Sequence, residues 1–477
     1  MVKNEQHKSH DRIFTYAVGF AWFAYVVYSI SKHSMFRDEQ NAWQLAKNPN
    51  SIFEMLGNSR YEGRPPTYFL ILRGLSLVSN APEAIKAVSI VCAAISGFVI
   101  LNKLRVHLYL RILLLLTFPF SGVYFVFVRE YSLVILLLVL ICWIALDGKL
   151  MSVLGVFLIG LLMFVNLFGL MMGISITMYL IFQSTFDRRK TKMSAMFLSL
   201  VAGLSILLMI PPGDTTFVGN QLGEETSTIL RTFVYKIAQI FFPFNQQTWS
   251  DKIRLYAFAF SVLFLLAIGY SFWKTSRPVF IAFFVYSGLF FSNVAIGYAW
   301  YWWHFGMYQS FVLILIVLSI STQKSKTILK KNLMIPGAIT AAFCGISVLS
   351  SFIGPGEMMF TNQEFSNAKR AATAIQKLCA LDECFIAATD HAIGVPLAGY
   401  LNQPVFFLDK GHFGSFFDWK TESRAVDPWS DLIDLSLPSE MVVLASSVPL
   451  TDADRYLFIE AFSDAVWENY WLYVVRL

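Results

Sequence analysis

Long apolar runs recur along this chain and limit the folds that it can adopt. Each run has about 16–21 residues, close to what an α-helix needs to cross roughly 30 Å of hydrocarbon. Backbone groups inside a bilayer must be hydrogen-bonded within their own element, so the runs indicate spanning helices rather than strands. We expect about eleven transmembrane helices, at 13–30, 85–102, 112–128, 131–146, 151–168, 169–184, 194–210, 255–273, 279–297, 306–321 and 333–353.

Composition and charge agree with a polytopic α-helical membrane protein. Hydrophobic residues make up 56% of the 477 positions and charged residues 14%, against about 25% charged residues in soluble domains. The net charge of +6 is first an orientation signal, because much of the Lys and Arg lies in short loops between the runs. The run at 13–30 lacks a small-residue cleavage site, so we expect it to be the first span and not a signal peptide.

The basic loops predict the orientation. If the N-terminus is cytoplasmic, the loops that share its side are all short and basic, as the positive-inside rule requires. Counting 65–80 as a further span would reverse this pattern, so we predict an interfacial helix there, with Arg73 reaching the headgroups. Three long segments then face outward, namely the loop 31–84, the loop 211–254 and the tail from residue 354.

The chain is predicted to divide near residue 353. Residues 1–353 would form the membrane module, and residues 354–477 a small extracytoplasmic α/β domain. Cys379 and Cys384 lie in this tail, where an oxidising compartment permits a disulfide. A metal site is the weaker interpretation of this pair, because no further ligands lie nearby. The predicted elements of the tail are a helix at 367–377 and strands at 384–389, 404–408 and 441–446.

Charged side chains gather in the first outer loop. Asp38 and Glu39 follow the first span directly. Sugar transfer to a hydroxyl or amine needs a carboxylate to deprotonate the acceptor and cations to hold the departing phosphate. Asp38 is a candidate base, and the candidate phosphate ligands are Arg37, Arg60 and Arg64. The alternative is that these are ordinary charges that solvate the loop at headgroup level.

A second segment of this loop carries a family resemblance. It reads Tyr61-Glu62-Gly63-Arg64-Pro65-Pro66-Thr67-Tyr68 and opens the predicted interfacial helix. An Asp-Glu pair after the first span, followed roughly 25 residues later by a Pro-Pro segment, resembles the GT-C superfamily, which includes aminoarabinose transferases and protein O-mannosyltransferases. Some relatives have Tyr-Glu-Gly-His-Pro-Pro here, whereas this chain has Arg64 at the His position.

Two later outer-face turns extend the resemblance. Arg129-Glu130-Tyr131 is similar to a recurring Arg-x-Tyr element, and His304-Phe305-Gly306 to a recurring His-x-Gly sequence. Arg129 ends an apolar run, where a charge is costly unless it is paired or functional. Its role is therefore either to bind phosphate or to pair with Glu130. The tryptophans around His304 fit either sugar stacking or an interfacial aromatic belt.

The resemblance implies an inverting glycosyltransferase of the bacterial inner membrane. Its donor would be a polyprenyl-phosphate-linked sugar, and its acceptor an envelope glycan, lipid or protein. Asp38 and Glu39 would be the catalytic carboxylates. The outer segment 226–242 would be either a mobile amphipathic lid or an inert surface helix. The substrate-binding candidates are Arg37, Arg60, Tyr61, Glu62, Arg64, Arg129, Tyr131 and His304.

Cofactors and other functions are also constrained by the sequence. The first outer loop has no Asp-x-Asp sequence, so we expect transfer without a required metal, although Glu39 leaves a divalent cation open. No Walker motif, Gly-rich dinucleotide loop or basic and aromatic groove is evident, so membrane lipids and not nucleic acid are the expected partners. A flippase of lipid-linked saccharide and an O-antigen-type polymerase stay open as alternatives, although transporters tend to show inverted repeats and midplane charges.

Overall fold

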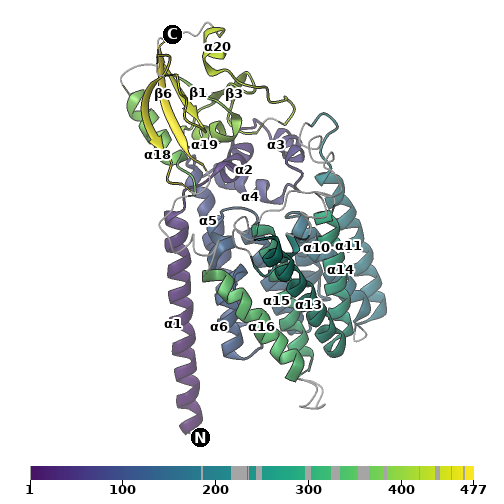
Figure 1. Ribbon diagram of the computed structural model, residues 1–477. Coiled ribbons are helices and arrows are strands. Elements are labelled where there is room, and N and C mark those ends of the chain that lie inside the picture. The colour runs from purple at the N-terminus through teal and green to yellow at the C-terminus, as the bar shows by residue number, and fades with distance from the viewer. Residues whose placement is uncertain are drawn as a thin grey trace.

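The computed structural model describes thirteen stretches of the chain, and its helices and sheet occupy different ends of the molecule. Helix α1 (Val2–Lys32) runs from the N-terminus towards the C-terminal sheet, and the other long helices pack beside it (Figure 1). Residues 226–233 and 235 of the predicted lid lie outside the described residues. The described residues are 2–183, 186–215, 234, 236–242, 250–295, 302–323, 334–352, 365–380, 384–417, 419–435, 441–452, 454–465 and 468–476.

The segment from residue 37 to 352 is helical wherever an element is described. Its helices are α2 (Arg37–Lys47), α3 (Ile52–Ser59), η1 (Arg60–Glu62), α4 (Thr67–Ser76), η2 (Pro82–Ala84), α5 (Ile85–Asn102), α6 (Leu108–Leu116), η3 (Pro119–Val123), α7 (Tyr124–Val126), α8 (Tyr131–Leu146), α9 (Val153–Met163), α10 (Leu167–Phe182), α11 (Arg188–Met209), α13 (Asp251–Thr275), α14 (Arg277–Ala295), α15 (Trp302–Gln323) and α16 (Met334–Phe352).

An apolar helix lies in each of the eleven predicted spans, but fewer are long enough to cross a bilayer. Helices α8 and α10 have 16 residues each, a rise of about 24 Å, which is less than the roughly 30 Å of hydrocarbon. The number eleven therefore stays a prediction. Within the described ranges, five helices qualify by length and composition, or six if a bent pair counts as one: Ile13–Lys32, Pro82–Asn102, Arg188–Met209, Lys252–Thr275 and Arg277–Val294.

The predicted span at 112–128 coincides with most of the bent pair. Helix α6 ends at Leu116, and the next helical segment begins at Pro119 and turns by 66°. Pro119 has no N–H to continue the helix, and Gly122 adopts a φ of +133°, which glycine tolerates best. The turn leads the chain to the loop 127–130, which enters the charged site described below.

The predicted interfacial segment 65–80 contains the ten-residue helix α4, which is too short to span a bilayer. The contact of Arg73 with the headgroups stays a prediction, and within the protein Arg73 is partly buried. Its guanidinium donates to the backbone carbonyls of Ala46 and Lys47, at 3.1 and 2.6 Å, and so satisfies free carbonyls in the last turn of α2. This contact ties α4 to α2.

The C-terminal residues form a six-stranded mixed sheet with the order β3-β2-β1-β4-β6-β5. Strand β1 is parallel to both β2 and β4, and the other pairings are antiparallel. Helices α18 (Ala368–Leu378) and α19 (His391–Leu401) pack on one face, and α20 (Pro428–Ile433) on the other. The strands are β1 (Cys384–Ala388), β2 (Val405–Phe407), β3 (His412–Gly414), β4 (Met441–Ser446), β5 (Leu457–Phe462) and β6 (Tyr470–Arg476).

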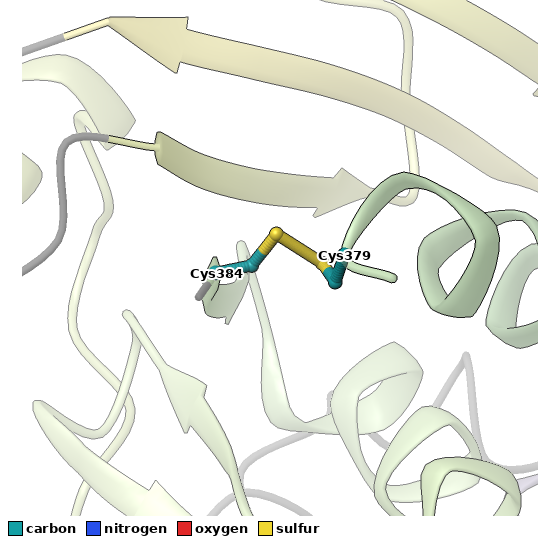
Figure 2. Close-up of a disulfide and its surroundings, with 2 residues drawn as sticks. All are labelled: Cys379 and Cys384. Atoms are coloured by element: carbon teal, nitrogen blue, oxygen red, sulfur yellow. A yellow bond between two sulfur atoms is a disulfide. The ribbon is translucent and has the colours of Figure 1, made fainter. Parts of the chain in front are cut away.

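The predicted helix and three strands of the tail coincide with α18, β1, β2 and β4, and β3, β5 and β6 are additional. A disulfide joins Cys379, after α18, to Cys384, at the start of β1, with 5.5 Å between the Cα atoms (Figure 2). The sequence favours this pairing. Cys92, Cys142 and Cys344 are buried in helices.

Helix α19 docks the sheet on α2. At Gly399 an added Cβ would lie 2.1 Å from Oε1 of Gln40, so this close approach needs a residue without a side chain. The Tyr400 hydroxyl also accepts the backbone N–H of Met35 at 2.9 Å. The C-terminal domain is therefore fixed against the helix that carries Asp38.

Candidate functional site

Glu39 holds three segments together at the end of α1. Its carboxylate contacts Nε2 of His33, at 2.7 Å from Oε2 and 2.9 Å from Oε1. It also accepts the backbone N–H groups of Phe36 at 3.1 Å and Val128 at 3.0 Å. Phe36 is the N-cap of α2 and Glu39 is its third residue, so this bond is the half of a capping box in which the third side chain accepts the N-cap N–H. Glu39 is 0% exposed, so it positions the backbone and leaves Asp38 as the accessible carboxylate of the predicted pair.

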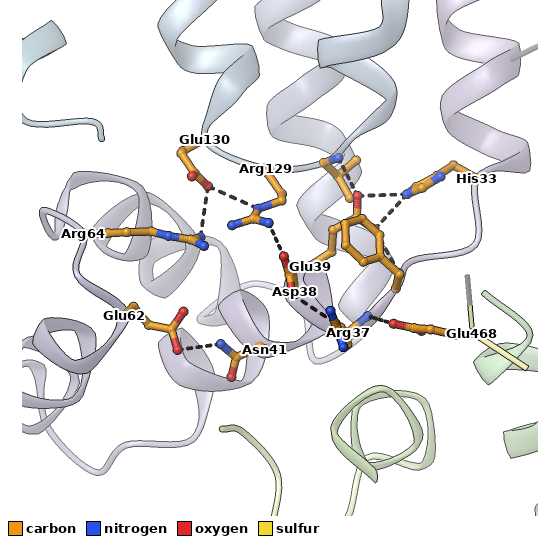
Figure 3. A network of polar contacts seen from close by, with 12 residues as sticks. His33, Arg37, Asp38, Glu39, Asn41, Glu62, Arg64, Arg129, Glu130 and Glu468 are labelled. Carbon is orange, nitrogen blue, oxygen red and sulfur yellow. Dashed lines mark hydrogen bonds and ion pairs between the residues drawn. The ribbon is translucent and has the colours of Figure 1, made fainter. Parts of the chain in front are cut away.

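Asp38 points away from Glu39 and lies between two guanidinium groups (Figure 3). Successive helical residues are about 100° apart, which separates the two carboxylates. Oδ2 of Asp38 forms an ion pair with Nη1 of Arg129, and Oδ1 lies 3.6 Å from Nε of Arg37. The Asp38 side chain is 27% exposed. The predicted base is thus held in place by cations and remains partly accessible.

Glu130 and Arg64 continue this line of charges. Oε2 of Glu130 lies 3.6 Å from Nε of Arg129 and 3.5 Å from Nη1 of Arg64. The side chains of Arg129 and Glu130 are 3% and 4% exposed, whereas that of Arg64 is 25% exposed. Arg37, Asp38, Arg64, Arg129 and Glu130 are called the Asp38 cluster below.

The arginines of the cluster keep its two carboxylates ionised. Burial would raise the pKa of Asp38, but the neighbouring arginines, Arg129 foremost, outweigh burial and hold that pKa below its usual value. Burial likewise would raise the pKa of Glu130, and Arg64 and Arg129 lower it. Within the Asp38 cluster three guanidinium groups face two carboxylates. The carboxylates of Glu62 and Glu39 also act on Arg64 and Arg129.

The Tyr61 to Tyr68 segment shapes the backbone around Arg64. Gly63 follows η1 with a φ of +62°, the left-handed conformation that glycine adopts without strain. Two prolines then lead directly into α4 at Thr67. The buried Tyr68 hydroxyl donates to the carbonyl of Val128 at 2.8 Å, so this segment is tied to the loop that carries Arg129.

The structure does not bring every predicted substrate residue into the cluster. Arg60 is exposed on η1. The Tyr61 hydroxyl donates to the carboxylate of Asp214 at 2.9 Å. Glu62 accepts the indole N–H of Trp419 at 2.8 Å and so faces the C-terminal domain.

Tyr131 and His304 lie beneath the cluster. The Arg129 guanidinium carbon is 5.5 Å from the centre of the Tyr131 ring, a cation–π distance. The His304 ring is 6.3 Å from Tyr131 and 5.1 Å from Phe168, centre to centre, and His304 is 7% exposed. These two residues therefore pack behind the arginines at a distance from solvent.

Sequence reasoning missed two residues that support Asp38. His33 binds Glu39, and its place six residues earlier, at the end of the first span, was a visible signal. Glu468 accepts the backbone N–H of Arg37 at 2.8 Å from the far end of the chain, and no local motif points to it. Both fix the first turn of α2, which carries Asp38.

Glu468 predicts a pH dependence of stability. Burial raises its pKa to about 8, from about 4.5 when exposed. The unfolded chain therefore releases this proton at lower pH than the folded chain, so the free energy of unfolding falls as pH rises from about 4.5 to about 8 and then levels off. Glu468→Gln keeps an acceptor for Arg37 and removes this contribution. Thermal unfolding in detergent should show a smaller loss of Tm between pH 5 and pH 8.5 in the variant; an unchanged loss contradicts the assignment.

Among the residues that the structure describes, no group of three or more His, Cys, Asp or Glu side chains has an arrangement that could hold a metal ion. Asp38 faces arginines and Glu39 faces His33. The expectation of transfer without a required metal stays a prediction. Comparisons of the chain with protein-family models, with curated proteins and with solved structures each find no match.

Proposed function

We propose that this chain is a multi-pass glycosyltransferase of the GT-C type in a bacterial plasma membrane. It transfers a sugar from a polyprenyl-phosphate donor to a cell-envelope glycan, lipid or protein at the outer surface. The observation that carries the proposal is Asp38, a partly exposed carboxylate held among three arginines where the first apolar helix ends. A base and phosphate ligands at headgroup depth suit a donor whose polyprenyl chain lies in the bilayer.

Asp38 acts as the base in this proposal. An acceptor hydroxyl oxygen attacks the anomeric carbon of the donor, and its proton passes to the Asp38 carboxylate. The bond from that carbon to the phosphate oxygen breaks, and the electron pair leaves with the polyprenyl phosphate. Attack opposite the leaving group inverts the anomeric centre. Asp38 is ionised at neutral pH, as a proton acceptor must be.

Arg64 is the best candidate to bind the phosphate. Arg129 is 3% exposed and already pairs with Asp38 and Glu130, so its role is to position the base. Arg64 is 25% exposed, and its contact with Glu130 is long, at 3.5 Å. A phosphate oxygen can therefore replace or share that contact without uncovering a buried charge. Of the predicted phosphate ligands, this assignment gives the phosphate to Arg64 and the orientation of the base to Arg129.

The orientation has its own test. We propose a cytoplasmic N-terminus, eleven spans and an extracytoplasmic C-terminal domain, in keeping with the short basic loops. Alkaline phosphatase fused after Leu477 should be active and a green fluorescent protein there dark, whereas truncation and fusion at Lys149 should give the reverse. A fluorescent fusion at Leu477 contradicts this topology.

Transfer can be measured with the purified protein in proteoliposomes. A panel of undecaprenyl-phosphate-linked hexoses and pentoses serves as donor, with envelope extract as acceptor. We expect release of undecaprenyl phosphate and incorporation of labelled sugar from at least one donor. Movement of an intact donor between leaflets without release would instead support the flippase, and no release from any donor contradicts the proposal.

A further inference from the structure

The C-terminal sheet has a feature that the proposed transfer does not use. Strand β1 is parallel to β2 on one side and to β4 on the other. The chain goes from β1 to β2 in one direction across the sheet and later adds β4 on the opposite side of β1, so the strand order reverses at β1. In open α/β sheets, ligands bind at the carboxyl ends of the strands beside such a point. Here those ends carry Asp390 and His391 after β1, Asp409 after β2 and Ser447 after β4.

These residues form an ordered polar group. Asp409 contacts Nδ1 of His391 at 2.5 Å and accepts the backbone N–H of His391 at 2.9 Å, which fixes the imidazole. Asp390 accepts the N–H of Ile393 at 3.1 Å and the Ser447 hydroxyl at 3.0 Å. The His391 side chain is 18% exposed, and Nδ1 is the ring nitrogen that Asp409 engages, so Nε2 is left for an outside hydrogen bond.

Two aromatic rings stand beside this imidazole. The ring centres of Phe417 and Trp419 lie 5.4 and 6.3 Å from that of His391, and 5.2 Å from each other. Both side chains are half-buried. Aromatic faces beside hydrogen-bonding groups suit a saccharide, because a sugar ring presents C–H groups on its face and hydroxyls at its edge.

The aromatic pair is linked to the helix that carries Asp38. The indole N–H of Trp419 donates to Oε1 of Glu62 at 2.8 Å, and the side-chain amide of Asn41 donates to the same oxygen at 2.9 Å. Oδ1 of Asn41 accepts the backbone N–H of Phe417 at 2.8 Å. Asn41 follows Asp38 by three residues, so both lie on one side of α2 less than one turn apart.

We propose that this sheet edge, formed by His391, Asp409, Phe417, Trp419 and Glu62, is the acceptor subsite and binds a neutral, hydroxyl-rich saccharide. The inference rests on the proposed sugar transfer, because it supplies the second substrate of that reaction. The carboxylates of Glu62, Asp390 and Asp409 disfavour a phosphate or uronate at this edge and accept hydrogen bonds from hydroxyls. Asn41 connects this edge to α2, the helix that carries Asp38.

The test separates saccharide binding from transfer. Full-length protein in nanodiscs is probed with an array of neutral and acidic oligosaccharides, and the acceptor KM and the acceptor-free release of undecaprenyl phosphate are measured in parallel. Trp419→Ala should weaken neutral glycan binding and raise the acceptor KM by about tenfold or more, with donor release unchanged. Trp419→Phe keeps an aromatic face and should lose less. Trp429→Ala is the matched control and should bind as wild type. Trp429 is a half-buried tryptophan of α20 that packs edge-to-face against Tyr456.

The outcomes distinguish the two proposals. If transfer occurs and Trp419→Ala leaves the acceptor KM unchanged, the subsite is overturned and the glycosyltransferase proposal is kept. If the wild-type protein binds a glycan, Trp419→Ala loses that binding and no donor supports transfer, the subsite is kept and the glycosyltransferase proposal is overturned. Equal losses in Trp419→Ala and Trp429→Ala, or preferential binding of acidic glycans, overturn the subsite. If Trp419→Ala does not fold, His391→Ala gives the same comparison.

Discussion

Asp38→Asn is expected to lower kcat for sugar transfer by about 10²–10⁴-fold, the range that general-base catalysis supplies. The amide cannot accept the acceptor proton at neutral pH, but it keeps the size of the side chain and an oxygen for Arg129. The donor KM should change little, because Arg64 and not Asp38 contacts the phosphate in this account. Initial rates in proteoliposomes measure both constants.

A matched substitution controls for the loss of a carboxylate. Asp464→Asn removes the partner of Arg370 in an exposed ion pair of the C-terminal domain, where the Asp464 side chain is 71% exposed. Its kcat should equal that of the wild type. Full activity of Asp38→Asn would remove Asp38 as the base, and an equal loss in both variants would point to a general effect on folding.

Arg129→Met is expected to have the largest effect on stability, a loss on the order of 3–5 kcal/mol. The methionine fills much of the volume but leaves the buried Glu130 carboxylate, which is 4% exposed, and Asp38 without their shared cation. A buried charge that loses its partner keeps the cost of desolvation. Denaturant unfolding in detergent, followed by tryptophan fluorescence, measures the change.

Arg37→Met is the control for this prediction. Arg37 also contacts Asp38, at 3.6 Å, but its side chain is 45% exposed. Exposed ion pairs contribute about 0–1 kcal/mol because water screens them, so this variant should stay close to the wild type. If Arg129→Met and Arg37→Met lower the free energy of unfolding by similar amounts, burial does not determine how much Arg129 contributes to stability.

The positions of the apolar helices could be predicted from hydropathy, but their lengths and bends could not. An apolar composition marks the segments that favour the hydrocarbon of a bilayer, and every predicted run contains a helix. A run such as 112–128 does not show by composition alone that its helix breaks at Pro119. The proline was visible in the sequence, and its missing N–H is the physical reason for the break.

The residue types of the candidate site were predictable, but their pairing was not. Asp38 and Arg129 are 91 positions apart, and only the fold brings them into contact. The different roles of Asp38 and Glu39 could have been inferred, because adjacent residues on one helix point about 100° apart. Of the sheet-edge residues, Glu62 was predicted, whereas His391, Asp409, Phe417 and Trp419 escaped notice. They follow three different strands, β1, β2 and β3, and the strand order is needed to bring His391 and Asp409 together.

The account is tested most directly by locating the phosphate in a cryo-electron microscopy structure of the full chain with undecaprenyl phosphate. We expect phosphate density within hydrogen-bond distance of the Arg64 guanidinium, on the side of α2 that presents Asp38. The same phosphate remote from Arg64 and Asp38 would contradict the account. One such position is the cavity of about 420 Å³ at the opposite end of the helices, lined by His107, Thr275 and Gly337.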